Sequence, residues 1–138
     1  MKRKQFIVKT IGVMSFFMAT LSYAGIPLWT FTPLTATTIT VPSNATAIVQ
    51  YIVTNQSDRA HTLMMSPIPA ITQLTTGPGI CASTFVLPSK ESSCVLSLEI
   101  HGDQLTHRIT DGPIVCQQGN PNQCYRPSSS DLLNITPE

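Results

Sequence analysis

The chain has 138 residues, of which 11% carry a charge, and its formal net charge is +1. Four of the eight Lys and Arg residues lie in the first nine positions, so residues 25–138 keep four basic against seven acidic side chains, a formal charge of −3. Four scattered cations cannot neutralise a run of phosphates, which excludes a basic nucleic-acid-binding protein. The length suits one domain with its own core, and an apolar fraction of 42% predicts that it folds.

Residues 1–24 have the layout of a signal peptide. Three basic residues follow the initiator Met, an uncharged stretch rich in apolar residues covers 10–29, and small residues lead up to Ala24. The alternative is an uncleaved membrane anchor, since the uncharged stretch nearly reaches the roughly 20 residues that span a bilayer. Gly25 and Pro27 interrupt its second half and favour cleavage after Ala24. We therefore expect an exported protein, periplasmic or secreted, that meets the membrane only through its signal peptide.

From Gly25 onward the chain is a series of short β-prone runs separated by turns rich in Gly, Pro, Asn and Asp. The first run, residues 28–32, carries Trp29 and Phe31 on one face. The strand candidates after it are residues 37–41, 45–54, 61–65, 84–87, 94–101, 114–116 and 132–135. Turn signals recur about every 8 to 12 residues, which is typical of a β-sandwich. We therefore predict a single all-β domain over residues 25–138, an immunoglobulin-like antiparallel β-sandwich.

Two of these runs indicate where the core lies. Residues 45–54 form the longest run, and both of its faces are partly apolar, which favours a central strand. In residues 94–101 the pattern is cleaner, because Leu96, Leu98 and Ile100 share one face while polar side chains occupy the other. That run predicts a strand with one buried face and one face in water.

Four cysteines in a chain bound for an oxidising compartment predict two disulfides. Cys81, Cys94, Cys116 and Cys124 allow three pairings, and the spacing alone excludes none of them. Locality favours Cys81 with Cys94 and Cys116 with Cys124, because the second pair brackets a turn-rich segment that closes readily. Each closure stabilises the fold by roughly 2.5 to 3 kcal/mol in the chain-entropy model.

The run YIVTNQSDRAHTLMM, followed by a C-x12-C spacing that ends in SCVLSLEI, resembles the Hydin-like, choice-of-anchor type immunoglobulin-like domains of bacterial exported proteins. In that family a central strand ends in a T-N turn, which Thr54 and Asn55 match. A cysteine pair flanks one strand of the family's domain, and Cys81 and Cys94 match that pair. The resemblance implies the fold and the exported location, and it implies little about function.

The wider chain, from LWTFTPLTATTITVP to VCQQGNPNQCY, resembles short single-domain exported proteins of Gram-negative bacteria that live in eukaryotic cells. Two features depart from the generic domain. The approach to Cys94 is LPSKESSC, without the Pro-Gly that the family often has, so this turn must differ. The pair Cys116 and Cys124 is absent from the generic domain.

The segment from Cys116 to Tyr125 is the candidate for recognition. A disulfide would close it into a loop with a low ordering cost, and its amide side chains can both donate and accept hydrogen bonds. The candidate recognition residues are Gln117, Gln118, Asn120, Asn122, Tyr125 and Arg126. The alternative is that Cys116 and Cys124 only staple a hairpin, and the sequence does not separate the two.

No catalytic, cofactor-binding or metal-binding site is predicted. His61, Met64 and Met65 suggest Cu(I) ligands, with His101 and His107 able to complete a site, but adjacent methionines on a strand point to opposite faces. No nucleophile signature marks any of the serines, and the least poor acid/base candidate is His107 with Asp103 or Asp111. The cysteines have no C-x-x-C spacing for zinc.

The sequence therefore predicts a non-enzymatic binding or adhesion module that meets a protein or a glycan through its loops. Nucleic acid is not an expected partner. The alternative is a structural or chaperone-like subunit of an envelope assembly, which joins its neighbours by strand addition. In that case the run 28–32 would be the donor strand, whereas otherwise it is the first strand of its own sandwich. A periplasmic copper-binding protein is the third hypothesis.

Overall fold

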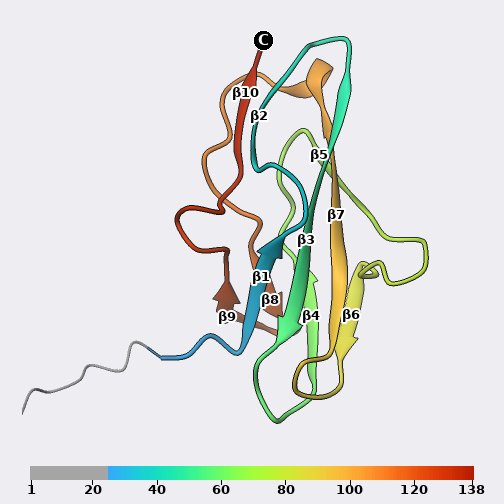
Figure 1. Cartoon of the computed structure of the whole chain (residues 1–138), viewed down its shortest axis with the longest axis vertical. Helices are drawn as coiled ribbons and strands as arrows, with labels where there is room; N and C mark the ends of the chain where they lie inside the picture. Colours follow the sequence, from blue (N-terminus) through green and yellow to red (C-terminus); the bar gives the residue numbers. More distant parts are fainter. Residues whose placement is uncertain (1–24) are drawn as a thin grey trace, which may run out of the picture.

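The computed structural model describes residues 25–138, and the expected signal peptide at residues 1–24 lies outside this range. Ten strands and one short 3-10 helix make up the regular structure of the described residues (Figure 1). The elements are β1 (Trp29–Pro33), β2 (Thr38–Val41), β3 (Thr46–Asn55), β4 (His61–Met65), β5 (Ile71–Leu74), β6 (Thr84–Leu87), β7 (Ser93–His101), η1 (Gly102–Gln104), β8 (Val115–Gln117), β9 (Asn120–Tyr125) and β10 (Asn134–Pro137).

Two four-stranded sheets form the body of the domain. The first sheet has the order β1-β3-β7-β5 and the second has the order β6-β4-β8-β9, and every strand pair within them is antiparallel. A separate two-stranded sheet joins β2 to β10 in parallel. The all-β class is confirmed, and the two antiparallel sheets fit the immunoglobulin-like sandwich that the sequence predicts. The parallel β2–β10 pair is an addition to the antiparallel pattern.

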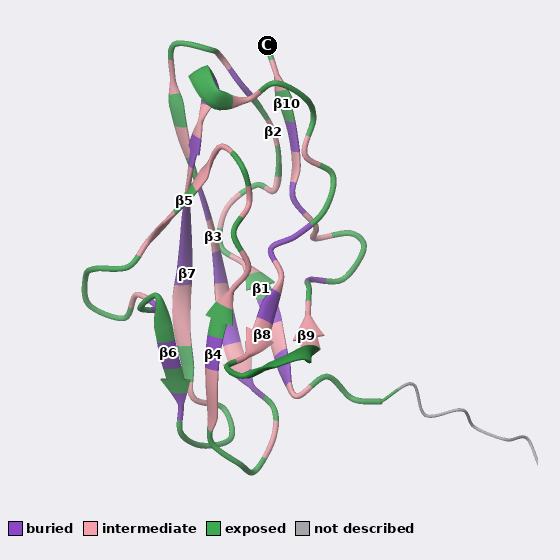
Figure 2. Cartoon of the chain, turned by 180° about the vertical axis from the view of Figure 1, so that it is seen from behind, coloured by how far each residue is buried: buried purple, intermediate pink, exposed green. Residues whose placement is uncertain are grey.

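The core lies between the two large sheets, and the alternation of side chains along β3 shows why. Val49, Tyr51 and Val53 are fully buried on its inner face, whereas Ile48 on its outer face is 43% exposed. Buried (purple) segments alternate with less buried ones along β3 in Figure 2 for this reason. Because β3 pairs with β1 on one side and with β7 on the other, the prediction of a central strand at residues 45–54 is confirmed.

Trp29 joins the two sheets directly. It lies in β1, which pairs with β3, and its side chain is fully buried. Its indole side chain extends across the core, and the Nε1–H donates a hydrogen bond to the carbonyl oxygen of Val115 in β8 at 3.2 Å. The run 28–32 is therefore the first strand of its own sandwich, and the arrangement in which it is a donor strand is not the one found.

Asn55 is the last residue of β3, and its side chain hydrogen-bonds to neighbouring segments at one end of the sandwich. Its side chain is fully buried, and its Nδ2 donates to the carbonyl oxygens of Arg59 (2.8 Å) and Leu87 (3.0 Å). Its Oδ1 accepts the Ser57 N–H at 2.8 Å, and its own carbonyl oxygen accepts the Glu91 N–H at 2.7 Å. One amide side chain thus joins the β3–β4 turn to the end of β6. The T-N turn that carries the family resemblance has this physical role here.

Both disulfides have the pairing that locality favours. Cys81 pairs with Cys94 and Cys116 pairs with Cys124, over sequence separations of 13 and 8 residues. Cys81 is only 1% exposed and ties a loop to β7 inside the core. The prediction of two disulfides is confirmed, and the structure selects one of the three pairings that the spacing left open.

Two strands differ from the sequence prediction. β5 was not expected, because Ile71–Leu74 is only four residues long and lies between proline and glycine turns; it is formed by pairing with β7. β9 replaces much of the expected loop at residues 116–125. It contains Pro121, which has no N–H to donate, and a proline is tolerated there because β9 is the edge of its sheet.

Candidate recognition site

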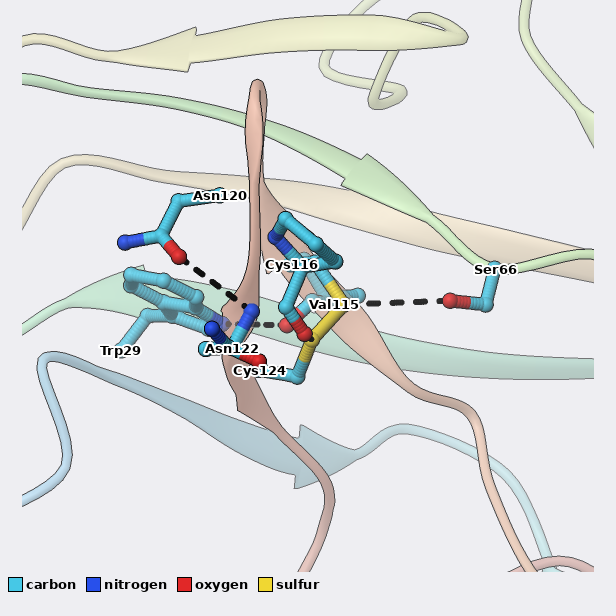
Figure 3. The surroundings of a disulfide bond; sticks show 8 residues. Trp29, Ser66, Val115, Cys116, Asn120, Asn122 and Cys124 are labelled. Carbon is cyan, nitrogen blue, oxygen red and sulfur yellow. Dashed lines mark hydrogen bonds between the residues drawn. A yellow bond between two sulfur atoms is a disulfide. The ribbon is translucent and has the colours of Figure 1, made fainter.

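The candidate recognition segment is a β-hairpin made of β8 and β9. Gln118 and Gly119 connect the two strands, and Gly119 has a φ of 76°, a conformation that favours glycine. Cys116 and Cys124 are directly opposed, so their disulfide clamps the hairpin between its two strands (Figure 3). A β-bulge between Cys116 and Gln117 shifts the register beyond the clamp. The disulfide therefore limits the conformations open to the exposed end of the hairpin.

Three of the six predicted recognition residues are exposed at that end. These are Gln118, Asn120 and Asn122. The Oδ1 atom of Asn120 accepts the backbone N–H of Asn122 at 3.2 Å, which fixes the local turn (Figure 3). Together the three side chains offer amide donors and acceptors to solvent from one short, cross-linked segment.

The other three predicted residues are engaged within the protein. His61 Nδ1 and Gln117 Oε1 are 2.8 Å apart. The Tyr125 ring packs edge-on against Trp29, with 4.7 Å between ring centroids. Arg126 donates to the Asp111 carboxylate at 2.6 Å, in an exposed ion pair. These contacts attach the base of the hairpin to the rest of the domain. They therefore limit the movement of the segment that carries the exposed amides.

A cleft of about 230 Å³ lies between the hairpin and the end of β4. It is lined by Met64, Met65, Ser66, Pro67, Cys116, Gln117, Gly119, Asn120 and Pro121. No charged side chain is among these residues, and the thioether, proline and disulfide groups make the lining mainly apolar. The Ser66 hydroxyl lies 3.8 Å from Cys116 Sγ across the cleft (Figure 3). A ligand that covers the end of the hairpin would thus contact both the apolar cleft and the exposed amide side chains beside it.

The sequence suggested the hairpin but not the residues that border the cleft from β4. The sequence indicates Met64 and Met65 only as candidate metal ligands, and it does not mark Ser66 or Pro67 as site residues. β4 pairs with β8 some fifty residues further along the chain, with Met64 opposite Cys116 and Met65 opposite Val115. No local pattern indicates that pairing, because a strand register depends on partners that are remote in sequence.

The histidines suggested as copper ligands make hydrogen bonds in separate parts of the domain. His61 Nε2 is 2.6 Å from Ser57 Oγ, and its other ring nitrogen faces Gln117. His101 Nε2 is 2.9 Å from Thr72 Oγ1, and His107 Nδ1 is 2.8 Å from Thr106 Oγ1. Met64 is exposed on β4, while Met65, on the other face, packs against the core.

The acid/base candidate is likewise dispersed. Asp111, which the sequence places near His107, accepts a hydrogen bond from Arg126 on its Oδ2 and the Gly112 N–H on its Oδ1 at 2.7 Å. Asp103 lies in the 3-10 helix η1 and is exposed. The structure instead joins a different histidine, His61, to a serine and an amide. Sequence reasoning missed that group.

No family model, curated protein or solved structure matches the chain. The resemblance to Hydin-like, choice-of-anchor domains therefore stays a prediction made from the residues. Within residues 25–138, no helix has the length and apolar character to cross a bilayer.

Proposed function

We propose that this chain is an exported, non-enzymatic binding module that recognises a protein or a glycan through the β8–β9 hairpin. The observation that carries the proposal is the row of exposed amides Gln118, Asn120 and Asn122 on a disulfide-clamped hairpin beside the 230 Å³ cleft. A pre-ordered segment loses less conformational entropy on binding than a mobile loop of the same composition. The hairpin is thus suited to recognition in a way that the other turns of the domain are not.

Export is supported by the two disulfides together with the signal-like N-terminus. Disulfides persist in the periplasm and outside the cell, whereas thiols in the cytosol are kept reduced. Fractionation into cytoplasm, periplasm, membrane and culture medium tests this step. We expect the protein, with Gly25 as its first residue, in the periplasm or the medium. Recovery of the full-length chain from the cytoplasm with free thiols would contradict export.

The binding test compares three forms of the purified domain, residues 25–138. The first is the wild type, and the second carries Gln118→Ala, Asn120→Ala and Asn122→Ala at the hairpin end. The third is a matched control with Asn44→Ala and Gln104→Ala, two amides that are exposed elsewhere. All five positions are on the surface, so each form should fold with a stability close to that of the wild type.

Each form is applied to a glycan array and to cell-surface proteins from the envelope and from host cells. We expect the hairpin variant to lose at least about tenfold in affinity for the ligand that the wild type binds, since a few well-placed residues dominate most interfaces. The control variant should bind as the wild type does. Equal binding by all three forms would remove the hairpin from the proposal, and it would leave the fold unaffected.

A further inference from the structure

Ser57, His61 and Gln117 form a hydrogen-bonded chain beside the base of the hairpin. Ser57 Oγ lies 2.6 Å from His61 Nε2, and His61 Nδ1 lies 2.8 Å from Gln117 Oε1. The three residues come from the β3–β4 turn, the start of β4 and the end of β8. A hydroxyl, an imidazole and an acceptor in this order have the connectivity of a serine nucleophile with its base and the group that orients the base.

The third residue decides the tautomer of the histidine. Gln117 Oε1 is a carbonyl oxygen and can only accept, so the proton of the neutral His61 ring is on Nδ1. Nε2 then has its lone pair directed at Ser57 and accepts the Ser57 hydroxyl proton. The carbonyl oxygen of Arg59 also lies near that hydroxyl, but at 3.2 Å it is a longer contact than the imidazole at 2.6 Å.

The nucleophile and the base are both held in place. The backbone N–H of Ser57 donates to the buried Asn55 side chain, and the Arg59 N–H donates to Ser57 Oγ at 3.2 Å. The imidazole packs against the buried Trp29 ring, with 5.4 Å between ring centroids. Ser57 itself is half-buried, so part of its surface meets solvent. Such a constrained pair needs little reorganisation before reaction.

We propose that Ser57 is an activated nucleophile that takes up one acyl group from a small activated ester. Ser57 Oγ attacks the ester carbonyl carbon, and His61 Nε2 accepts the hydroxyl proton. The bond from the carbonyl carbon to the leaving oxygen then breaks, and His61 returns the proton to the departing alkoxide or phenoxide. The products are an ester at Ser57 and one alcohol or phenol. This reaction is a single acylation of the protein and does not depend on the binding function.

The amide of Gln117 leads to a specific prediction about the rate of Ser57 acylation. A neutral amide orients the imidazole but does not stabilise the positive charge that the ring gains during the attack, whereas a carboxylate does both. Gln117→Glu should therefore accelerate acylation by about tenfold or more, which corresponds to about 1.4 kcal/mol in the barrier. A purely structural hydrogen bond between His61 and Gln117 would give no such gain.

The test incubates the folded domain, residues 25–138, with p-nitrophenyl acetate and, separately, with a fluorophosphonate. Release of p-nitrophenol gives the rate, and peptide mapping by mass spectrometry locates the label. We expect one label, at Ser57, in the wild type and none there in Ser57→Ala. His61→Gln should react at least about a hundredfold more slowly, the usual loss when a general base is removed. Ser129→Ala, which changes an exposed serine elsewhere, should react like the wild type.

Thermal unfolding shows whether each variant is folded before its rate is compared. An unlabelled Ser57 in the wild type overturns the proposal, and so does a folded His61→Gln variant that labels at the wild-type rate. If His61→Gln does not fold, Gln117→Glu decides: faster labelling at Ser57 supports the nucleophile, and an unchanged or slower rate overturns it.

Discussion

The Cys81–Cys94 disulfide lies in the core, whereas the Cys116–Cys124 disulfide joins the two strands of a hairpin at the edge of a sheet. Cys81 is 1% exposed, and its bond fixes a long loop to the start of β7. Cys116 and Cys124 are half-exposed and already face each other through strand pairing. The same covalent bond thus supports burial in one region and shapes a surface in the other.

The role of each disulfide depends on the residues that surround it. In the chain-entropy model the two rings, which differ little in size, stabilise by similar amounts, about 3 and about 2.5 kcal/mol. The surroundings separate them, because only the first bond includes a cysteine that is buried in the core. We therefore expect the core region to respond to substitution with a loss of stability, and the hairpin to respond mainly with a loss of binding.

Removal of the core disulfide should destabilise the domain most. Cys81→Ala with Cys94→Ala should lower the free energy of unfolding by about 4 kcal/mol, about 3 from ring closure and about 1 from lost packing of the sulfurs. Guanidinium unfolding followed by the fluorescence of Trp29, the single tryptophan of the chain, measures it. A loss smaller than that of the matching Cys116→Ala, Cys124→Ala variant would reverse the comparison.

Asn55 tests whether the core region also depends on a buried polar group. Asn55→Ala removes two donated hydrogen bonds and one accepted one, and it leaves the Arg59 and Leu87 carbonyl oxygens without that partner. We expect a loss of about 3 kcal/mol in the free energy of unfolding, since unpaired buried groups cost about 1 to 3 kcal/mol each. Asn44→Ala, at an exposed asparagine, is the control and should change little. Similar values for both variants would contradict the role given to Asn55.

The sequence predicted the strands whose apolar residues form a recognisable pattern within the strand itself. Residues 45–54 and 94–101 became β3 and β7 within one residue at each end, because both runs are long and their inner faces are apolar. β5 was missed because it has only four residues between proline and glycine turns, and β9 was missed because it contains Pro121 and is mainly polar. Strands of that kind form only when a neighbouring strand is in place to pair with them, and that information is remote in sequence.

The candidate site was predictable in part for the same reason. A cysteine pair around an amide-rich segment marks the hairpin, and the disulfide followed from locality. Which amides face solvent did not follow, since Gln117 is engaged by His61, 56 positions earlier in the chain. The inward position of Tyr125 likewise depends on Trp29, which reaches it only after the two sheets have packed. Pairings over such distances cannot be read from local periodicity.

The next effect in size concerns the hairpin clamp. Cys116→Ala with Cys124→Ala should lower the free energy of unfolding by about 2.5 kcal/mol, and the domain should remain folded. Ligand affinity should fall further than this modest loss suggests, because the amides would then have to be ordered on binding. Titration of the ligand identified with the wild type, below the unfolding temperature of the variant, measures the change. Undiminished affinity would show that the clamp is only structural.

The smallest expected effect concerns the contact between the core and the segment that follows the hairpin. The Tyr51 hydroxyl donates to the carbonyl oxygen of Asp131 at 2.6 Å, so Tyr51→Phe should cost about 1 kcal/mol near neutral pH. Burial raises the pKa of Tyr51 above its ordinary value of 10.0, and the Asp131 charge raises it further. The folded state thus keeps this proton at a pH where the unfolded state has lost it.

Because the folded state binds more protons than the unfolded state there, stability is full below about pH 10 and falls as the pH rises further, by up to about 1.4 kcal/mol per pH unit from this group. Tyr51→Phe lacks that contribution, so its disadvantage relative to the wild type should stay level between about pH 8 and pH 9 and shrink between about pH 10 and pH 11. Urea unfolding of both forms across this range measures the gap. A gap that stays constant would show that the Tyr51 hydroxyl is not shielded from water, and the core would then be more open at this end than the hydrogen bond to Asp131 implies.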